Sequence, residues 1–427
     1  MGRMFQGSGP RLRPKAQAIN LGGKPDLESP DLYLHEEHHD VFRRLRAEEP
    51  VYWNPEADST GFWAITRYDD IEAISKNPKL FSSAKENGGH RIFNENDIDG
   101  NDTDASMISM DPPEHASYRR MVTPGFVPKR ITGMEDRIRA RVTRLLDNLP
   151  KTGEAEFVSS VAAVLPIEVL AELFGVPESD GPKLFEWSNA TVGEDDPELR
   201  VSDEYMKKCV LEMAGYAAGL WQQRLENPGA DLISMLAHSR VNGEAMTFPT
   251  YIGTFILLVV GGNETTRNSI SGGLLALSEN PEERRKLLDD PSLIPSAVQE
   301  IVRWVSPVLH MRRTATEDTE IRGQKIRKGD KVVMWYASGN RDEDKWDDPF
   351  RFDVTRYAKP NVATQLGFGA GQHFCLGSRL AELQLKVLFE ELLRRFPDIH
   401  VSGPVRRMRS NFIYGLKEMP VAYTPEA

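Results

Sequence analysis

The chain has 427 residues, with 53 lysine and arginine residues against 64 aspartate and glutamate residues, and its net charge is −11. An acidic balance of this kind supports solubility and argues against a nucleic-acid partner. Two cysteines, Cys209 and Cys375, are too few for a disulfide framework, which favours a reducing cytoplasm. Residues 1–20 hold no apolar run, so we expect neither a signal peptide nor a membrane anchor.

The sequence of the first part of the chain predicts an N-terminal arm followed by short helices and strands. We expect a loosely ordered arm over 1–35 and one domain over 36–427, because no long linker or internal repeat divides that stretch. The local patterns predict short elements in the order helix 39–48, strand 51–53, strand 61–66 and helix 68–76. The polar stretch 83–106 then predicts a mobile loop of the kind that covers a binding site.

The rest of the chain is dominated by helical periodicity, which runs from 131 to 288 and contains Cys209 in a structural position. Strand signals return at 332–335 and at 412–414. Together these patterns predict a mainly α protein with a small β-rich part.

One long helix is predicted over 247–277, and its middle breaks the usual composition rules. At 1.5 Å per residue it would span roughly 45 Å. Its apolar first half runs into Gly261-Gly262-Asn263-Glu264-Thr265-Thr266, where glycine and threonine are locally unfavourable. The Thr265 hydroxyl could bond the Gly261 carbonyl or displace a backbone bond, and either would open a bulge able to hold water. A glycine-packed core helix is the plainer reading, but it leaves the charge of Glu264 unexplained.

The second cysteine lies in the glycine-rich loop Phe368-Gly369-Ala370-Gly371-Gln372-His373-Phe374-Cys375-Leu376-Gly377. Residues 378–396 read as an apolar-striped helix, so the Cys375 sulfur would lie near the positive end of a helix dipole, which favours the thiolate. A buried structural cysteine and a phosphate-binding loop remain as alternatives to a sulfur ligand for iron. Zinc fits poorly because a structural site needs about four ligands and no second cysteine is near.

This loop matches the pattern Phe-Gly-x-Gly-x-His-x-Cys-x-Gly and resembles the haem-binding loop of the cytochrome P-450 family of haem-thiolate monooxygenases. The matching motifs run from about residue 110 to 384. The resemblance implies the P-450 fold, with a long central helix over haem b and Cys375 as the axial ligand of the iron. It implies that Glu264 and Thr265 are the acid–threonine pair that relays protons to bound O2. The residues that it places against the haem are His115, Arg119, Gly261, Arg313, Phe368 and His373.

The segment Glu300-Ile301-Val302-Arg303 resembles the family's Glu-x-x-Arg motif. Residues at i and i+3 share a helix face, so the two charges can pair. The resemblance implies that the pair also binds an arginine before the cysteine loop, for which Arg356 is the candidate. This role is structural. Arg120 and Arg312 are expected to be solvated surface cations.

The resemblance implies insertion of one oxygen atom from O2 into a C–H bond of a hydrophobic substrate. The wording of 261–269, 311–315 and 331–343 resembles bacterial terminal hydroxylases of medium-chain alkanes and fatty acids, although Glu264 stands where close members have aspartate. Terpene and steroid side-chain hydroxylases are the alternatives within the family. By family position the apolar pocket would be lined by Met107, Ile108, Leu257, Leu258, Gly261, Val308, Leu309 and Ile413.

Electrons are expected to come from NAD(P)H through a ferredoxin and its reductase, because the chain has no flavin or nicotinamide fingerprint and no iron–sulfur cysteine set. The expected docking face carries Arg119, Arg120, Lys129 and Arg130. Two other classes stay open. A peroxide-driven haem enzyme tends to lack the acid–threonine pair, and a non-catalytic haem sensor has no need of one.

Overall fold

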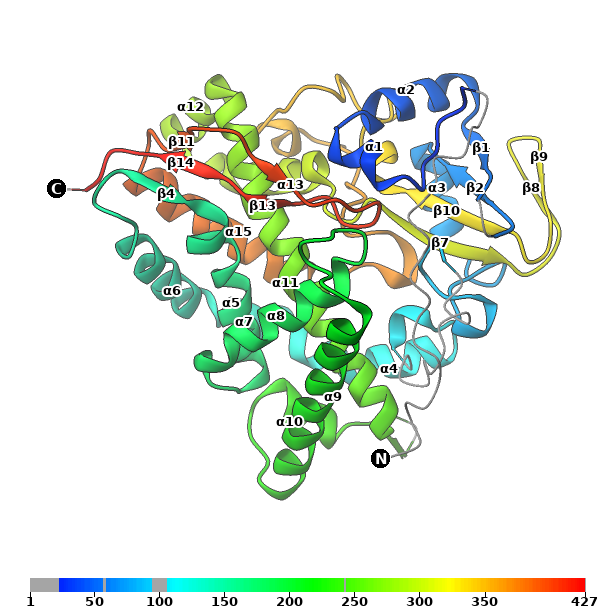
Figure 1. The fold of residues 1–427 in the computed structure, drawn as a ribbon, viewed down its shortest axis with the longest axis horizontal. Helices are drawn as coiled ribbons and strands as arrows, with labels where there is room; N and C mark the ends of the chain where they lie inside the picture. The colour runs from blue at the N-terminus through cyan, green and yellow to red at the C-terminus, as the bar shows by residue number, and fades with distance from the viewer. Residues whose placement is uncertain (1–22, 57–58, 94–105, 242, 427) are drawn as a thin grey trace.

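The computed structural model describes residues 23–56, 59–93, 106–241 and 243–426 (Figure 1). The helices are α1 Pro30–Leu34, α2 His38–Glu48, α3 Tyr68–Ser75, α4 Glu114–Val122, α5 Pro128–Thr132, α6 Glu135–Asp147, α7 Val164–Phe174, α8 Gly181–Val192, α9 Asp203–Glu226, α10 Leu232–Ala237, α11 Phe248–Glu279, α12 Pro281–Asp289, α13 Ile294–Val305, α14 Tyr336–Gly339 and α15 Ser378–Arg395. The mainly α prediction is confirmed, since about 53% of the structure is helical.

The strands are short and form a five-stranded sheet, a three-stranded sheet of the order β11-β14-β4 and three two-stranded hairpins. They are β1 Val51–Asn54, β2 Phe62–Ile65, β3 Phe81–Ser82, β4 Glu154–Glu156, β5 Arg240–Val241, β6 Glu244–Ala245, β7 His310–Ala315, β8 Thr319–Ile321, β9 Gln324–Ile326, β10 Lys331–Trp335, β11 His400–Val401, β12 Arg406–Arg407, β13 Leu416–Glu418 and β14 Pro420–Ala422. The larger sheet has the order β1-β2-β10-β7-β3. Its central strand β10 is buried along its whole length, as expected of an apolar strand paired on both sides.

The long central helix α11 is an uninterrupted α-helix of 32 residues, about 48 Å at 1.5 Å per residue. It begins where predicted, because the Thr247 side chain accepts a hydrogen bond from the Thr250 N–H and Pro249 occupies the first turn. Figure 1 shows α11 crossing the helical part of the molecule, with α7, α8, α13 and α15 packed around it. The bulge predicted at Thr265 is not present as a break in this helix.

Cys209 is buried on α9, as predicted. Two other predictions about local structure are wrong. Residues 23–35, expected within a loose arm, are packed: Leu27 and Tyr33 are 0% and 1% exposed, and they join a core cluster with Trp335. Residues 412–414 form no strand and contribute only an isolated bridge between Ile413 and Val308.

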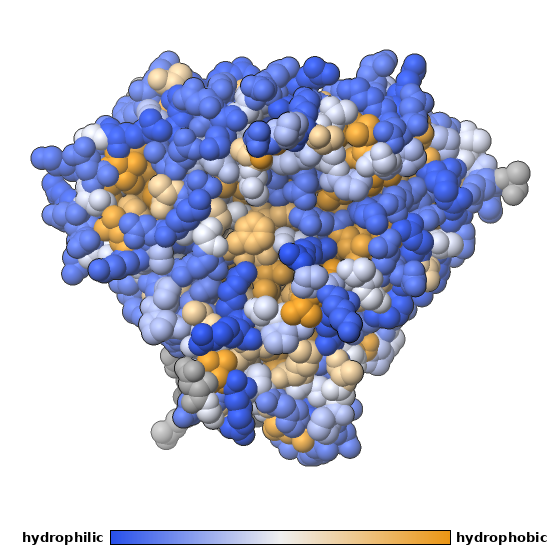
Figure 2. All heavy atoms as spheres, turned by 180° about the vertical axis from the view of Figure 1, so that it is seen from behind, coloured by the Kyte–Doolittle hydropathy of each residue, from blue (hydrophilic) through white to orange (hydrophobic). Residues whose placement is uncertain are grey.

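Much of the predicted loop 83–106 lies outside the described residues. The surface is mostly hydrophilic on the face shown in Figure 2, with hydrophobic residues gathered near its centre. Within the described residues, no helix is long and apolar enough to cross a membrane.

Candidate functional site

The cysteine loop is a tight turn that packs directly on α3. The Cys375 N–H donates to the Phe368 carbonyl at 2.8 Å, which closes the loop before α15 begins at Ser378. Gly369 and Gly371 have φ of 71° and 67°, the left-handed region that favours glycine. A Cβ on Gly371 would lie 2.1 Å from the Ser75 carbonyl oxygen at the end of α3. Glycine here therefore serves both the turn and a close backbone contact.

The Cys375 sulfur lies at the start of α15, as the sequence predicted. Burial raises the pKa of the Cys375 thiol, while hydrogen bonds from the Gly377 and Ser378 N–H groups and the charge of Arg119 oppose that rise. Donors aimed at the sulfur stabilise its thiolate form. Burial disfavours the thiolate form of Cys375, and a positively charged metal bound to the sulfur would offset this effect.

Two histidines from distant parts of the chain meet beside this loop. The rings of His115, on α4, and His373 lie 4.2 Å apart between centroids. The Nε2 atom of His373 is 2.9 Å from the Ser83 hydroxyl oxygen. The pKa of His115 is lowered to about 4 and that of His373 to about 2, chiefly by burial and in addition by the charges of Arg119 and Arg313. The four side chains therefore form one electrostatically coupled cluster.

The two arginines of this cluster have no acidic partner within the described part of the chain. Arg119 donates to the Phe374 carbonyl at 2.7 Å, directly beside Cys375. Arg313, 4% exposed, donates to the Arg312 carbonyl at 2.7 Å. Among the described residues no carboxylate pairs with either arginine, and Asp111 acts on Arg313 only at longer range. Burial lowers the pKa of both guanidinium groups.

These features fit a dianionic ligand beside an iron-binding sulfur. A buried arginine without a carboxylate is costly, and an anionic group bound between the arginines and histidines would remove that cost. The two propionates of haem are such groups, and the sulfur of Cys375 offers a thiolate for the iron.

Comparison with known proteins agrees with this geometry. A family model described as cytochrome P-450 matches residues 201–412. The linalool 8-monooxygenase of Pseudomonas putida is 50% identical over 408 residues, which cover 94% of this chain and 100% of that enzyme. The chain belongs to the cytochrome P-450 family. As a P-450 it is a haem-thiolate monooxygenase.

Two further relatives extend the comparison. The methyl-branched lipid omega-hydroxylase of Mycobacterium tuberculosis is 40% identical over 395 residues, which cover 90% of each chain. The structure of the Mycobacterium marinum P-450 CYP268A2 in complex with pseudoionone matches with a TM-score of 0.86 and 37% identity, covering 93% of this chain and 98% of that one. The predicted P-450 fold is thereby confirmed.

On the central helix of this P-450, Glu264 and Thr265 make contacts on different sides. The Thr265 hydroxyl donates to the Gly261 carbonyl at 2.8 Å, the first of the two arrangements predicted. Gly261 is exposed, and a Cβ added to it would meet nothing within 4 Å, so this part of α11 faces open space. Glu264, in contrast, is 0% exposed.

Glu264 is held by neighbours that the sequence analysis did not assign. Its carboxylate forms an ion pair with Arg267 and accepts hydrogen bonds from Asn263 Nδ2 at 3.0 Å and Ser188 Oγ, on α8, at 3.4 Å. Burial raises the pKa of the Glu264 carboxyl, and Arg267 and Ser188 oppose the rise. Glu264 and Arg267 stand at i and i+3 of one helix, and this spacing in the sequence could have predicted their ion pair.

The residues predicted to line the substrate pocket differ in their exposure. Leu257, Leu258 and Val308 keep partial exposure, whereas Leu309 is 0% exposed and packs with Trp335 in the N-terminal core cluster. Leu309 is therefore a core residue. Met107 and Ile413 are buried, and Ile108 is half-buried.

The two arginines expected at the surface differ. Arg120 is exposed, as predicted. Arg312 is 3% exposed and donates to the carbonyl oxygens of Asn87 at 3.2 Å and Phe93 at 3.1 Å. The prediction that Arg312 is a solvated cation is wrong, because it ties strand β7 to the loop that follows β3.

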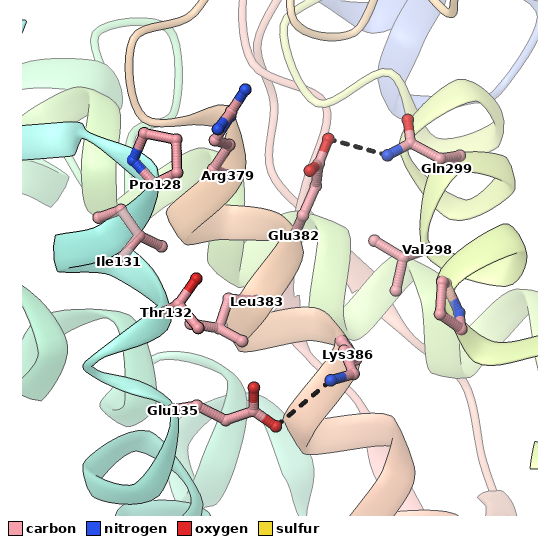
Figure 3. Close-up of a pocket in the computed structure, with 11 residues that line it drawn as sticks. Pro128, Ile131, Thr132, Glu135, Val298, Gln299, Arg379, Glu382, Leu383 and Lys386 are labelled. Atoms are coloured by element: carbon pink, nitrogen blue, oxygen red, sulfur yellow. Dashed lines mark hydrogen bonds and ion pairs between the residues drawn. The ribbon is translucent and has the colours of Figure 1, made fainter. Parts of the chain in front are cut away.

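A separate groove of about 310 Å³ lies beside the N-terminal half of α15 (Figure 3). It is bounded by α5, α13 and α15, with Arg379 near its rim and Glu382 bonded to Gln299 at 2.8 Å. Arg379 is four residues after Cys375, so the groove opens on the side of the molecule that carries the start of α15. Lys129 is exposed nearby on α5, while Arg130 is half-buried and donates to the Ala230 carbonyl at 2.8 Å.

Proposed function

We propose that this P-450 binds haem b through Cys375 and hydroxylates an end carbon of a branched terpene-like hydrocarbon. The observation that carries the proposal is the pair Arg119 and Arg313, for which no carboxylate partner is found among the described residues, beside a cysteine whose sulfur accepts backbone hydrogen bonds. When bound, the haem supplies the activation of O2 that a thiolate ligand favours.

The residues that hold the haem follow from the contacts of the cluster. Arg119 and Arg313, with His115 and His373, supply hydrogen-bond donors for the two propionates. Ser83 orients the His373 ring through its hydroxyl. Phe368, on the cysteine loop, and Gly261, on α11, would contact the haem ring.

The proton path uses the two residues that follow the glycines of α11. The Thr265 hydroxyl lies next to the open face and passes a proton on, and Glu264 is the carboxyl that supplies it. In the present arrangement the carboxylate is tied to Arg267, so it must leave this ion pair, or exchange protons through water, to reach Thr265. The raised pKa of the Glu264 carboxyl is the direction that a proton donor needs.

The substrate class is better supported for terpenes than for linear alkanes. The sequence motifs at 261–269, 311–315 and 331–343 favoured medium-chain alkanes and fatty acids as substrates, with terpenes as the alternative. The relative that acts on linalool matches half of all positions over nearly the whole chain, and a similar structure holds pseudoionone. The omega-hydroxylase relative acts on methyl-branched lipids. A branched chain with an accessible end carbon is the feature that these names share.

Electrons reach the protein from NAD(P)H through a ferredoxin and its reductase in the cytoplasm. The chain carries no fingerprint for a cofactor that would deliver them. The exposed cations Arg120, Lys129 and Arg379 lie on the elements near Cys375 and suit an acidic protein partner.

A titration of the haem-loaded protein with linalool, a linear alkane, a fatty acid and a sterol tests the substrate class. A bound substrate that displaces water from ferric iron shifts the Soret band toward its high-spin position. We expect the shift with linalool at the lowest concentration. A shift with the linear alkane alone would support an alkane substrate. A shift with the sterol alone would support hydroxylation of a steroid side chain. A haem sensor would bind a ligand but give no product with electrons supplied.

A further inference from the structure

The connection between β12 and β13, residues 408–415, packs against the apolar side chains beside the open part of α11. We call these residues the hairpin loop. Its apolar side chains belong to a cluster that also contains Val260, Val308 and Met311. These three side chains keep partial exposure, and Val260 directly precedes Gly261, where α11 faces open space. The hairpin loop therefore supports the apolar wall next to this part of α11.

Backbone pairing joins the hairpin loop to Val308. Ile413 and Val308 form an isolated antiparallel bridge. On one side of the bridge, the Leu309 N–H donates to the Phe412 carbonyl at 2.9 Å. On the other side, the Tyr414 N–H donates at 2.9 Å to the carbonyl of the residue that precedes Val308. Because these contacts follow one another along both segments, a displacement of the hairpin loop moves Val308 as well.

The start of the chain also binds the hairpin loop. Figure 1 shows α1, in blue, beside the red C-terminal hairpin. The Arg409 guanidinium donates to both carboxylate oxygens of Asp31, at 2.6 and 3.0 Å. The Asn411 side-chain amide donates to the Glu28 carbonyl at 2.6 Å. The hairpin loop is therefore held between the start of the chain and the segment that carries Val308.

Glu36 holds the hairpin loop at its two ends. Its Oε1 atom forms an ion pair with Arg407 at 2.6 Å and accepts a hydrogen bond from the Tyr414 hydroxyl at 2.8 Å. Glu36 has φ of 61°, in the left-handed region that glycine adopts with less strain. Glutamate at a position whose backbone suits glycine points to a use for its carboxylate.

The geometry of these contacts makes them stronger than ordinary surface ion pairs. Exposed pairs contribute little unless they are bidentate or belong to a network. Asp31 binds Arg409 in the bidentate form, and the hydrogen bond from Arg409 is the main cause that lowers the pKa of Asp31. Glu36 is half-exposed, but its partner Arg407 is only 12% exposed. Apolar side chains of the same segment attach it to the core, so removal of either carboxylate should leave the segment folded.

We propose that Glu36 and Asp31 are positioning residues for the substrate pocket. They act through the hairpin loop and set the position of Val308 against a bound hydrophobic molecule. The two carboxylates thus affect the binding of large apolar molecules and the carbon that is presented for hydroxylation, but not the binding of small ligands to the iron. This inference rests on the proposed function, because that function places Val308 beside the substrate.

Two iron ligands of different size test this role in the haem-loaded protein, whatever its substrate is. Imidazole is small, whereas phenylimidazole carries an apolar ring that extends toward the wall. In Glu36→Gln and Asp31→Asn, the dissociation constant of phenylimidazole should rise on the order of fivefold, and that of imidazole should stay within about twofold of the wild type. Glu49→Gln, which removes an exposed ion pair with Lys24 in the same part of the chain, is the matched control.

Glu36→Gly separates positioning from a purely structural role. It relieves the left-handed backbone and removes the carboxylate. Its thermal midpoint should therefore be no lower than that of Glu36→Gln, while phenylimidazole binding is weakened to a similar degree. Tyr414→Phe removes only the hydroxyl that Glu36 binds. Combined with Glu36→Gly, it should weaken phenylimidazole binding no further than Glu36→Gly alone.

Linalool binding and its products are then compared in the same variants. The dissociation constant of linalool should rise as that of phenylimidazole does, and a smaller share of product should carry oxygen at an end carbon. Unchanged phenylimidazole binding in Glu36→Gln and Glu36→Gly, or an equal loss for both iron ligands, overturns the proposal. Failure of linalool to bind the wild-type protein counts against the proposed function, while the two iron ligands still decide the role of Glu36.

Discussion

Arg356 donates from Nε to the Glu300 carboxylate at 3.0 Å, although 56 residues separate the two in the sequence. Glu300 also pairs with Arg303 at 2.7 Å, and both residues are 0% exposed. The predicted three-residue lock is thus confirmed. Because Arg303 and Arg356 also donate to carbonyls of the segment 347–351, the lock fixes the chain that leads into the cysteine loop.

Glu300→Ala should destabilise the protein by about 3–5 kcal/mol, because it leaves two buried guanidinium groups without their carboxylate. Denaturant unfolding followed by helical signal and by haem absorbance measures this loss. Glu282→Ala, at an exposed position on α12, is the control and should be near neutral. A Glu300→Ala protein as stable as the control would show that the lock is dispensable.

Glu264→Gln and Thr265→Ala should each lower the product formed per electron consumed by tenfold or more, since each removes one member of the proton path. The measurement compares NAD(P)H consumption with hydroxylated product. Thr254→Val changes a buried threonine on the same helix and should leave the ratio as in the wild type. Equal ratios in all three variants would remove Glu264 and Thr265 from the mechanism.

Arg313→Met should have opposite effects on the two forms of the protein. Without haem, it removes a buried charge for which the described residues supply no carboxylate partner, so the thermal midpoint should rise. With haem, it removes a propionate donor, so transfer of haem to an acceptor protein should be at least tenfold faster. Arg327→Met, at an exposed position after β9, should change neither. A loss of stability in both forms would indicate a purely structural arginine.

His38 should make the protein less stable in mild acid. Burial, with the charges of Arg341 and Arg407, lowers its pKa from 6.5 to about 3, and the pKa of neighbouring His39 is lowered as well. The unfolded chain then binds more protons than the folded one between these values, so stability is complete above pH 6.5 and falls as pH decreases. The share of His38 at pH 5 is about 2 kcal/mol.

The comparison of wild type with His38→Leu over pH 5–8 isolates that share. The rings of Tyr33, Phe42 and Tyr414 surround His38, and an apolar side chain suits this environment. The variant should therefore lose less stability than the wild type on acidification. Parallel curves for the two proteins would contradict the assignment.

The features that sequence could predict are those with a local pattern. The bounds of α11 follow from the Thr247 cap and apolar periodicity, and the position of Cys375 before α15 follows from its glycines and the helix behind it. Leu309 was misplaced because it packs with Trp335 in a core cluster, and that contact between distant segments leaves no local pattern in the sequence. Residues 412–414 have strand-like composition but find no partner strand to complete a ladder.

Contacts across long stretches of chain were beyond a single sequence. Ser83 and His373 are 290 residues apart, and no spacing or periodicity links them. Arg312 and Arg313 are adjacent and chemically equal, yet one binds loop carbonyls and the other stays without a carboxylate. Successive side chains of β7 point to opposite faces of the sheet that it forms with β10, so the two arginines have different surroundings.

The function proposed for this P-450 requires that Cys375 anchors a haem that inserts one atom of O2 into a terpene. Incubation of the purified protein with a ferredoxin, its reductase, NAD(P)H, linalool and isotopically labelled dioxygen tests it directly by mass spectrometry of the product. The product should carry one labelled oxygen atom at an end carbon, and no labelled product should form when the Cys375→Ser protein is used. Product with unlabelled oxygen, or equal labelling in the Cys375→Ser protein, would contradict it.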